Sequence, residues 1–355
     1  MEKVAVFGAQ KGASKKTDDI KLKLNMSGNN FGNYLIGYSI DKQVENCDYF
    51  QFNKDLDFEY INEYYDRAII ASSNFINSVQ DLKNWADVIE KLDMPVTSIG
   101  LGAQALSKDE KINIKPGTER YLKIASEKSH TLGVRGEFTA EVLENLGIKN
   151  TEVIGCPSAF MSLDRNFQLD SQLKSLDKVL VHGNPRPNQM FYIKHLLNTF
   201  SHHDMHFLAQ TESQLLLMQK GLMSMDGIGN FMELKNLPEN IQSNLIDNTV
   251  HFDDVDLWKE YLKNVSLSIG GRFHGNMLAA QMNVPAIWVV HDTRSQEFIN
   301  LYEFPHIHMN DLPSLSHDEI LDEFSYEKFN KKYPVLYDNY IGFLNSNGIK
   351  HIFKN

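Results

Sequence analysis

Short apolar runs alternate with longer amphipathic segments along most of the chain, and this alternation restricts its fold more than any other feature of the sequence. The runs are rich in β-branched residues and predict buried strands at Val4–Phe7, Ala68–Ala71, Val96–Ile99, Leu132–Val134, Val153–Ile154, Val179–Val181, His206–Ala209, Val265–Ile269 and Ala286–Val290. The amphipathic segments predict helices at Asn74–Leu92, Thr118–Lys128, Glu137–Leu146, Asn188–Phe200, Asp254–Leu262 and Asn276–Met282. Strands and helices in alternation are typical of α/β proteins with mainly parallel sheets.

A polar stretch without periodicity, Ser162–Asp177, interrupts the alternation near the middle of the 355 residues and predicts a linker. We therefore expect an N-terminal Rossmann-like domain over residues 1–165 and a C-terminal one over 166–312, with a cleft between them. Residues 313–355 have helical patterns without strands. They predict a C-terminal helical tail that could pack back on the N-terminal domain, with its second helix interrupted near Pro334.

Composition limits the class of protein. With 42% hydrophobic and 23% charged residues the chain is globular, and it has no apolar run long enough for a membrane-spanning helix or a signal peptide. A formal net charge of −11 argues against general binding of nucleic acid. Cys47 and Cys156 are the only cysteines, which excludes a disulfide scaffold, and the thirteen histidines lack metal-ligand spacing, so no metal is expected. We expect a cytoplasmic protein.

The segment Ser266–Pro285, SLSIGGRFHGNMLAAQMNVP, carries the most chemistry. A predicted strand runs into two glycines and a new helix, so that backbone and a helix N-terminus can approach an anion closely. Arg272 can hold a carboxylate or phosphate with two parallel hydrogen bonds, and His274 adds a group that titrates near neutrality. The segment predicts an anion site containing an acid or base, and a packed glycine turn is the alternative. The residues expected to contact the ligand are Gly270, Gly271, Arg272, His274, Gly275 and Asn276.

Other predicted strand ends carry groups that could face the same cleft, because ligands of open α/β sheets bind at the carboxyl ends of strands. Arg135 follows one strand, and a local salt bridge to Glu137 or Glu141 is its alternative role. The segment SIGLGAQ imitates a dinucleotide fingerprint, but it lies outside the first βαβ unit, so we expect no dinucleotide. The further candidates for substrate binding are Gly100, Gly102 and Gln104 in that segment, Asn30 and Asn33 in a polar glycine loop, His182 after a strand, and Arg294.

Taken together, four segments in order resemble the polysaccharide pyruvyl transferase family: GNNFGNYLIGYS, SIGLGAQ, LGVRGEFTAEVLENLGIKNTEVIGCPS and SLSIGGRFHGNMLAAQMNVPAI. Arg272–Gly275 match the Arg-x-His-Gly element that is characteristic of members. The resemblance implies a GT-B-like fold of two Rossmann-type domains. It also implies transfer of the enolpyruvyl unit of phosphoenolpyruvate onto a sugar of a surface polysaccharide, such as an exopolysaccharide or capsule, or of its lipid-linked precursor. The product would be a cyclic pyruvate ketal, with phosphate released.

Phosphoenolpyruvate carries a phosphate and a carboxylate and needs two cationic anchors, which Arg135 and Arg272 would supply, while His274 would be the general acid. The donor is then a substrate, and no cofactor is expected. A lipid-linked acceptor would imply transient contact with the inner face of the membrane. Two alternatives stay open: a GT-B glycosyltransferase that uses a nucleotide sugar, with Glu297 on its ribose, and a non-catalytic glycan-binding protein on the same scaffold. The acceptor sugar and the oligomeric state stay open too.

Overall fold

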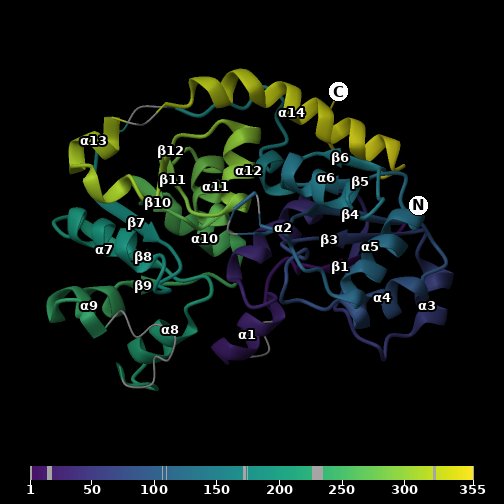
Figure 1. Ribbon diagram of the computed structural model, residues 1–355, viewed down its shortest axis with the longest axis horizontal. Coiled ribbons are helices and arrows are strands. Elements are labelled where there is room, and N and C mark those ends of the chain that lie inside the picture. The colour runs from purple at the N-terminus through teal and green to yellow at the C-terminus, as the bar shows by residue number, and fades with distance from the viewer. Residues whose placement is uncertain are drawn as a thin grey trace.

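The computed structural model contains two parallel β-sheets of six strands each, and Figure 1 shows them side by side. It describes residues 2–13, 18–105, 107–108, 110–170, 173, 175–225, 235–322 and 325–354. The two sheets lie on either side of the predicted linker, of which Ser171, Gln172 and Lys174 fall outside the described residues. Two parallel sheets with helices between their strands confirm the predicted α/β class and its GT-B-like arrangement.

The first sheet has the strand order β2-β1-β3-β4-β5-β6. Its strands are β1 (Val4–Gly8), β2 (Cys47–Phe50), β3 (Arg67–Ala71), β4 (Val96–Leu101), β5 (Leu132–Val134) and β6 (Thr151–Val153). The helices along this part of the chain are α1 (Ile20–Met26), η1 (Phe31–Asn33), α2 (Tyr34–Gln43), α3 (Phe58–Tyr64), α4 (Lys83–Glu90), α5 (Pro116–Lys128), α6 (Glu137–Glu144) and η2 (Pro157–Phe160). β3 and β4 are almost fully buried, as expected for the centre of a sheet covered on both faces.

The second sheet has the order β12-β11-β10-β7-β8-β9. Its strands are β7 (Lys178–His182), β8 (Asp204–Leu208), β9 (Thr249–Val250), β10 (Leu267–Gly270), β11 (Ala286–Val290) and β12 (His306–His308). The helices that follow the first sheet are α7 (Met190–Thr199), α8 (Ser213–Gln219), α9 (Glu239–Asp247), α10 (Val255–Leu262), α11 (Phe273–Gln281), α12 (Thr293–Tyr302), η5 (Leu312–Ser314), α13 (His317–Asp322) and α14 (Glu327–Ser346).

The last helix, α14, reaches back from the second sheet to the first, and Figure 1 shows it in yellow along one side of the molecule. Its Tyr340 hydroxyl donates a hydrogen bond of 2.8 Å to the side-chain oxygen of Gln43 in α2. The predicted interruption near Pro334 is wrong, because the helix is continuous through that residue. Tyr333 and Tyr337 are buried on either side of the proline, and this packing outweighs the one backbone hydrogen bond that proline cannot donate.

The predicted helix at Asn74–Leu92 is also wrong in its first half, because α4 begins only at Lys83. Asn77 accepts hydrogen bonds from the backbone N–H groups of Val79 and Gln80, and such a local turn competes with helix formation. The other predicted elements are present, with ends that differ by no more than three residues. β2 was not predicted, since its sequence CDYF lacks an apolar run and lies at the sheet edge.

The carboxyl ends of the two sheets meet. Ala105, shortly after β4, donates its backbone N–H to the hydroxyl of Thr293 after β11 at 3.0 Å. Phe31 donates its backbone N–H to the carbonyl of Gln210 after β8 at 2.9 Å. One buried apolar cluster contains side chains from both sheets, for example Ile69 of β3 and Trp288 of β11. The strand ends that carry the predicted site residues therefore face each other across one interface.

Candidate active site

The strand-turn-helix segment after β10 is held in place by His182 at the end of β7. The backbone N–H of Arg272 donates to Nδ1 of His182 at 3.1 Å, so the ring proton is on Nε2, which lies 3.0 Å from Oδ1 of Asn276. Burial lowers the pKa of His182 to about 3, which keeps the ring neutral. At Gly270, where φ is +149°, a Cβ would collide with the His182 carbonyl, so this turn requires glycine. His182 and Asn276, both predicted to bind substrate, here fix the turn.

The guanidinium of Arg272 is paired with a buried carboxylate that the sequence did not single out. Glu212, just after β8, contacts Arg272 Nη2, which also donates to the hydroxyl of Thr211 at 2.6 Å. The same carboxylate accepts the backbone N–H of Gln210 at 2.8 Å, which fixes the loop. Among the described residues, Nε of Arg272 is buried and has no hydrogen-bond partner. Arg272 is thus a compensated, rigid cation with one unused donor.

Arg135, directly after β5, is buried on the side of the first sheet. Its Nε donates to the carbonyl of Gly100 at 2.8 Å, and Nη1 donates to Oδ1 of Asn74 at 2.5 Å. A side chain at Gly102 would press on the Arg135 side chain, so that glycine makes room for it. In the described part of the chain no carboxylate lies within ion-pair distance of Arg135, and the local salt bridge considered from the sequence is not formed. A buried cation without a counter-ion is costly, and an anionic ligand would offset this cost.

His274, in the first turn of α11, lies where the two sheets meet. Its Nε2 is 3.5 Å from the Sγ of Cys156, which follows β6 of the first sheet. Burial and the nearby charges of Arg135 and Arg294 lower the pKa of His274 well below its usual range. The imidazole is therefore neutral at pH 7 while no anion is bound. Burial also raises the pKa of Cys156, so its thiol stays protonated.

Arg294, in the first turn of α12, is the third cation of this region. Its Nη2 lies 3.5 Å from Oδ2 of Asp292, the N-cap residue of α12. That carboxylate also accepts a hydrogen bond of 3.0 Å from the side chain of Gln104 in the first sheet's loop. Burial alone would raise the pKa of Asp292, but Arg294 and His291 outweigh it and hold the pKa at about 2. Nε of Arg294 is buried without a hydrogen-bond partner among the described residues.

Glu297, one turn further along α12, does not lie on a solvated helix face. Its carboxylate accepts the backbone N–H of Thr139 at 2.8 Å and the Thr139 hydroxyl at 3.1 Å, in the first turn of α6. Burial raises its pKa to about 7 despite these bonds. Both carboxylate oxygens are therefore bonded to Thr139, and the contact joins the two halves of the molecule.

The structure thus divides the predicted residues into three groups. Arg135, His274 and Arg294 come together. Gly100 and Gly102 contact Arg135, and Gln104 is bonded to Asp292 beside Arg294. Arg272 lies in the turn with Gly270, Gly271, Gly275, His182 and Asn276. The glycine loop is separate: Asn30 accepts the backbone N–H of Gly32 at 2.9 Å as a cap of η1, and Asn33 donates to the carbonyl of Ser27 at 2.9 Å. The sequence missed Glu212 and Asn74, although both follow strand ends, which is the signal that could have identified them.

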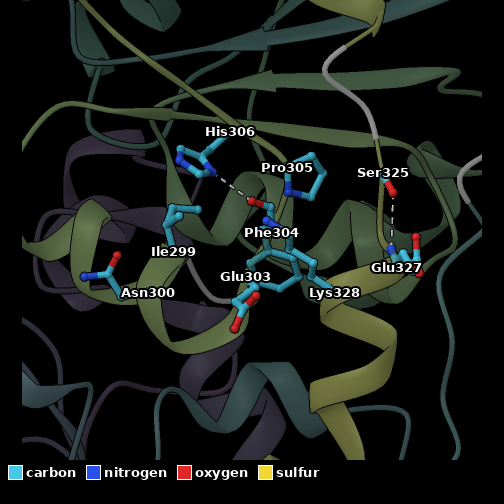
Figure 2. A pocket seen from close by; sticks show the side chains of 9 residues that line it. All are labelled: Ile299, Asn300, Glu303, Phe304, Pro305, His306, Ser325, Glu327 and Lys328. Atoms are coloured by element: carbon cyan, nitrogen blue, oxygen red, sulfur yellow. Dashed lines mark hydrogen bonds between the residues drawn. The ribbon is translucent and has the colours of Figure 1, made fainter.

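A cavity of about 530 Å³ lies away from these groups, where the end of α12, the start of β12 and α14 meet. Figure 2 shows its lining residues, with His306 bonded to the carbonyl of Phe304 and Glu327 bonded to Ser325. None of the predicted site residues lines it.

Over the described ranges, no three His, Cys, Asp or Glu side chains are placed to hold a metal ion. None of the helices in the described residues combines the length and low polarity that a membrane crossing needs.

Comparison with known proteins adds the family. The family model described as polysaccharide pyruvyl transferase matches residues 30–293, which include Arg135, Arg272 and His274. The match places the chain in a class of transferases that modify polysaccharides. More than two thirds of the sequence is matched, and the protein belongs to the polysaccharide pyruvyl transferase family. No curated protein matches the chain significantly in sequence.

Solved structures resemble the fold over nearly the whole chain. The UDP-N-acetylglucosamine 2-epimerase from Rickettsia bellii is 12% identical with a TM-score of 0.49, over 98% of this chain and 96% of that one. The UDP-GlcNAc 2-epimerase from Neisseria meningitidis is 9% identical with a TM-score of 0.48, over 98% and 99%. The lipopolysaccharide outer core galactosyltransferase WaaB is 13% identical with a TM-score of 0.40, over 98% and 99%.

Proposed function

We propose that this protein transfers the enolpyruvyl unit of phosphoenolpyruvate onto two hydroxyls of a sugar in a glycan or lipid-linked glycan. The C–O bond between the enol carbon and the phosphate oxygen breaks, and two bonds to sugar oxygens form. Of the two hydroxyl protons, one ends on the former methylene carbon, which becomes a methyl group, and the other leaves with the phosphate. The proposed reaction includes no cofactor.

The observation that supports this proposal best is the buried guanidinium of Arg135, which has no carboxylate partner in the described residues and lies near His274. Arg294 adds a second cation to the same region, and its Nε is an unused buried donor. A small ligand with a carboxylate and a phosphate would offset the charge of Arg135 and fill the unused donors. Arg272 would contribute its own free Nε from the neighbouring turn.

His274 is the proposed acid. The neutral imidazole of the empty site cannot donate the proton that the methylene carbon needs. Burial is the main cause of the low pKa, and the charges of Arg135 and Arg294 lower it further. An anion between the two arginines offsets this second cause and raises the pKa, and the proposal requires the ring to take up a proton when the donor binds. The same ring, neutral again after the transfer, can accept a proton from the attacking hydroxyl.

Thermal unfolding with separate ligands tests the donor. Phosphoenolpyruvate at about 100 times its dissociation constant adds roughly 2.7 kcal/mol, which raises the unfolding midpoint by several degrees. We expect this shift for the native protein and for Arg165→Met, whose arginine forms an exposed ion pair with Asp338. We expect it to fall to about half or less in Arg135→Met, and also to be weakened in Arg272→Ala. Stabilisation by UDP- or GDP-sugars and not by phosphoenolpyruvate would replace this proposal with the glycosyltransferase.

A further inference from the structure

A second cavity, of about 420 Å³, lies at the carboxyl ends of β1, β2 and β3, between the loop that joins α1 to η1 and the start of α4. Its volume is within the range of roughly 300–1,000 Å³ that is typical of small-molecule sites. It includes Asn33, which the sequence analysis placed among the substrate contacts. It is distinct from the group formed by Arg135, His274 and Arg294, none of which lines it.

The lining of this cavity is polar but uncharged. Of the described residues that form it, none is Asp, Glu, Lys, Arg or His, although such residues make up a large share of the chain. Asparagine, glutamine and serine side chains supply the polar groups, and each amide both donates and accepts hydrogen bonds. Paired donors and acceptors match sugar hydroxyls, which also do both. Among the described residues that line the cavity, a phosphate or carboxylate would find no cation to offset its charge.

One wall of the cavity is aromatic. Trp85 stacks on Phe52 with ring centroids 3.9 Å apart and meets Phe75 edge to face at 4.8 Å. Trp85 and Phe52 keep part of their surface accessible. Apolar C–H faces of a pyranose ring pack on such a wall, while the hydroxyls at the ring edge reach the amides.

Two of the amides are free to bind. Gln51, just after β2, and Gln80, before α4, are exposed, and their side chains make no hydrogen bond with other described residues. Side-chain amides that hold no structural contact are available to a ligand without loss of an internal bond.

The cavity adjoins the proposed reaction centre through two consecutive residues. Ser73 lines the cavity, and the side chain of the next residue, Asn74, accepts the hydrogen bond of 2.5 Å from Arg135. A sugar held in the cavity would therefore lie near Arg135, one of the cations proposed to hold the donor.

We propose that this cavity binds one uncharged sugar residue of the acceptor glycan, with the aromatic wall under the ring and Gln51 and Gln80 on its hydroxyls. That the bound sugar belongs to the acceptor rests on the proposed function. Binding of a neutral sugar in this cavity can be tested without any turnover. It also assigns selectivity, because a uronic acid would bury its carboxylate without a counter-ion.

Tryptophan fluorescence provides the test. Trp258 and Trp288 are 1% and 3% exposed, whereas Trp85 is partly accessible, so a ligand in this cavity changes the emission of Trp85. The probes are the methyl glycosides of glucose, galactose and mannose, with methyl glucuronide and uridine as comparisons. We expect a saturable change with at least one neutral hexoside, weaker binding of the glucuronide, and no response in Trp85→Phe.

The double variant Gln51→Ala, Gln80→Ala should weaken hexoside binding about tenfold, because two neutral hydrogen bonds are lost. Asn145→Ala, an exposed amide at the far end of α6, is the matched control and should bind as the native protein does. Absence of binding by all three hexosides, equal binding of the glucuronide, preference for uridine, or an unchanged double variant would each overturn the inference. Phosphoenolpyruvate binding is measured on the same samples: its failure alone would remove the proposed function and leave the sugar site standing.

Discussion

His274 Nε2 lies 3.5 Å from the Sγ of Cys156, and the two residues follow strands of different sheets. The Ser158 hydroxyl donates to the same sulfur at 3.0 Å, so the sulfur is held from the side of the first sheet. This contact places the imidazole at the meeting point of both halves of the molecule. It is also close enough to Arg135 and Arg294 for their charges to lower its pKa.

The first prediction concerns the proton on His274. Because burial and the two arginines hold its pKa well below 6.5, the ring is neutral at pH 7 in the empty site. An anion that offsets the arginines raises the pKa, so phosphoenolpyruvate binding should be accompanied by uptake of up to about one proton. Calorimetric titration in buffers of different ionisation enthalpy measures this number. In His274→Gln the uptake should disappear while binding persists, and equal uptake in both proteins would contradict the assigned role.

The second prediction concerns Arg135. Removal of its charge in Arg135→Met should weaken phosphoenolpyruvate binding by about ten- to a hundredfold, since a hydrogen bond to a charged group contributes about 1.5–3 kcal/mol. Arg135→Lys should recover only part of the affinity, because lysine cannot keep the Nε contact to Gly100 while facing the ligand. Direct titration gives both dissociation constants. Native affinity in the methionine variant would show that the donor binds elsewhere.

The third prediction separates a buried ion pair from an exposed one. Glu212→Ala should lower stability by about 3–5 kcal/mol, because it leaves Arg272 buried without its counter-ion and frees the backbone N–H of Gln210. Glu260→Ala, which breaks an exposed pair with Lys263, should cost no more than about 1 kcal/mol. Urea unfolding of the two variants makes the comparison. Similar losses in both would mean that Glu212 does not hold Arg272 in solution.

The fourth prediction is a pH dependence of stability from Glu297. Its folded pKa of about 7 lies above its ordinary value of 4.5, so between these values the folded state binds more protons than the unfolded state. Stability from this group is therefore complete below about pH 4.5, falls by up to roughly 3 kcal/mol as the pH rises to 7, and stays lower above that. Urea unfolding at pH 5 and 8 should show a larger loss in the native protein than in Glu297→Gln. Equal losses would remove Glu297 as the cause.

The alternation of apolar runs and helical patterns was enough to predict the α/β class, because parallel strands buried on both faces must be short and apolar. It could not predict β2, whose side chains are only partly buried at an edge, nor the late start of α4. The interruption predicted at Pro334 was wrong for a related reason. Local propensity favours a break there, and the burial of Tyr333 and Tyr337 in tertiary contacts decides otherwise.

The candidate site was predictable where one segment carries several groups, as in Gly270–Gly275. Pairings between segments distant in the chain were not. Glu212 meets Arg272 only through the neighbouring positions of β8 and β10 around β7, and Glu297 meets Thr139 only because the sheets face each other. His182 is a similar case. The sequence predicted that it faces a ligand, but its ring is enclosed by the turn after β10 and holds that turn in place.

Transfer of labelled carbon from phosphoenolpyruvate to a glycan is the most direct test of the proposed reaction. The native protein and His274→Ala are incubated with phosphoenolpyruvate labelled in its pyruvyl carbons and with free and lipid-linked glycans extracted from the cells that encode it. We predict that the native protein moves the label onto a glycan and releases one phosphate per label, and that His274→Ala slows this transfer by roughly 10²–10⁴-fold. Label that stays in phosphoenolpyruvate with the native protein, or transfer at an equal rate by His274→Ala, would contradict the proposed reaction.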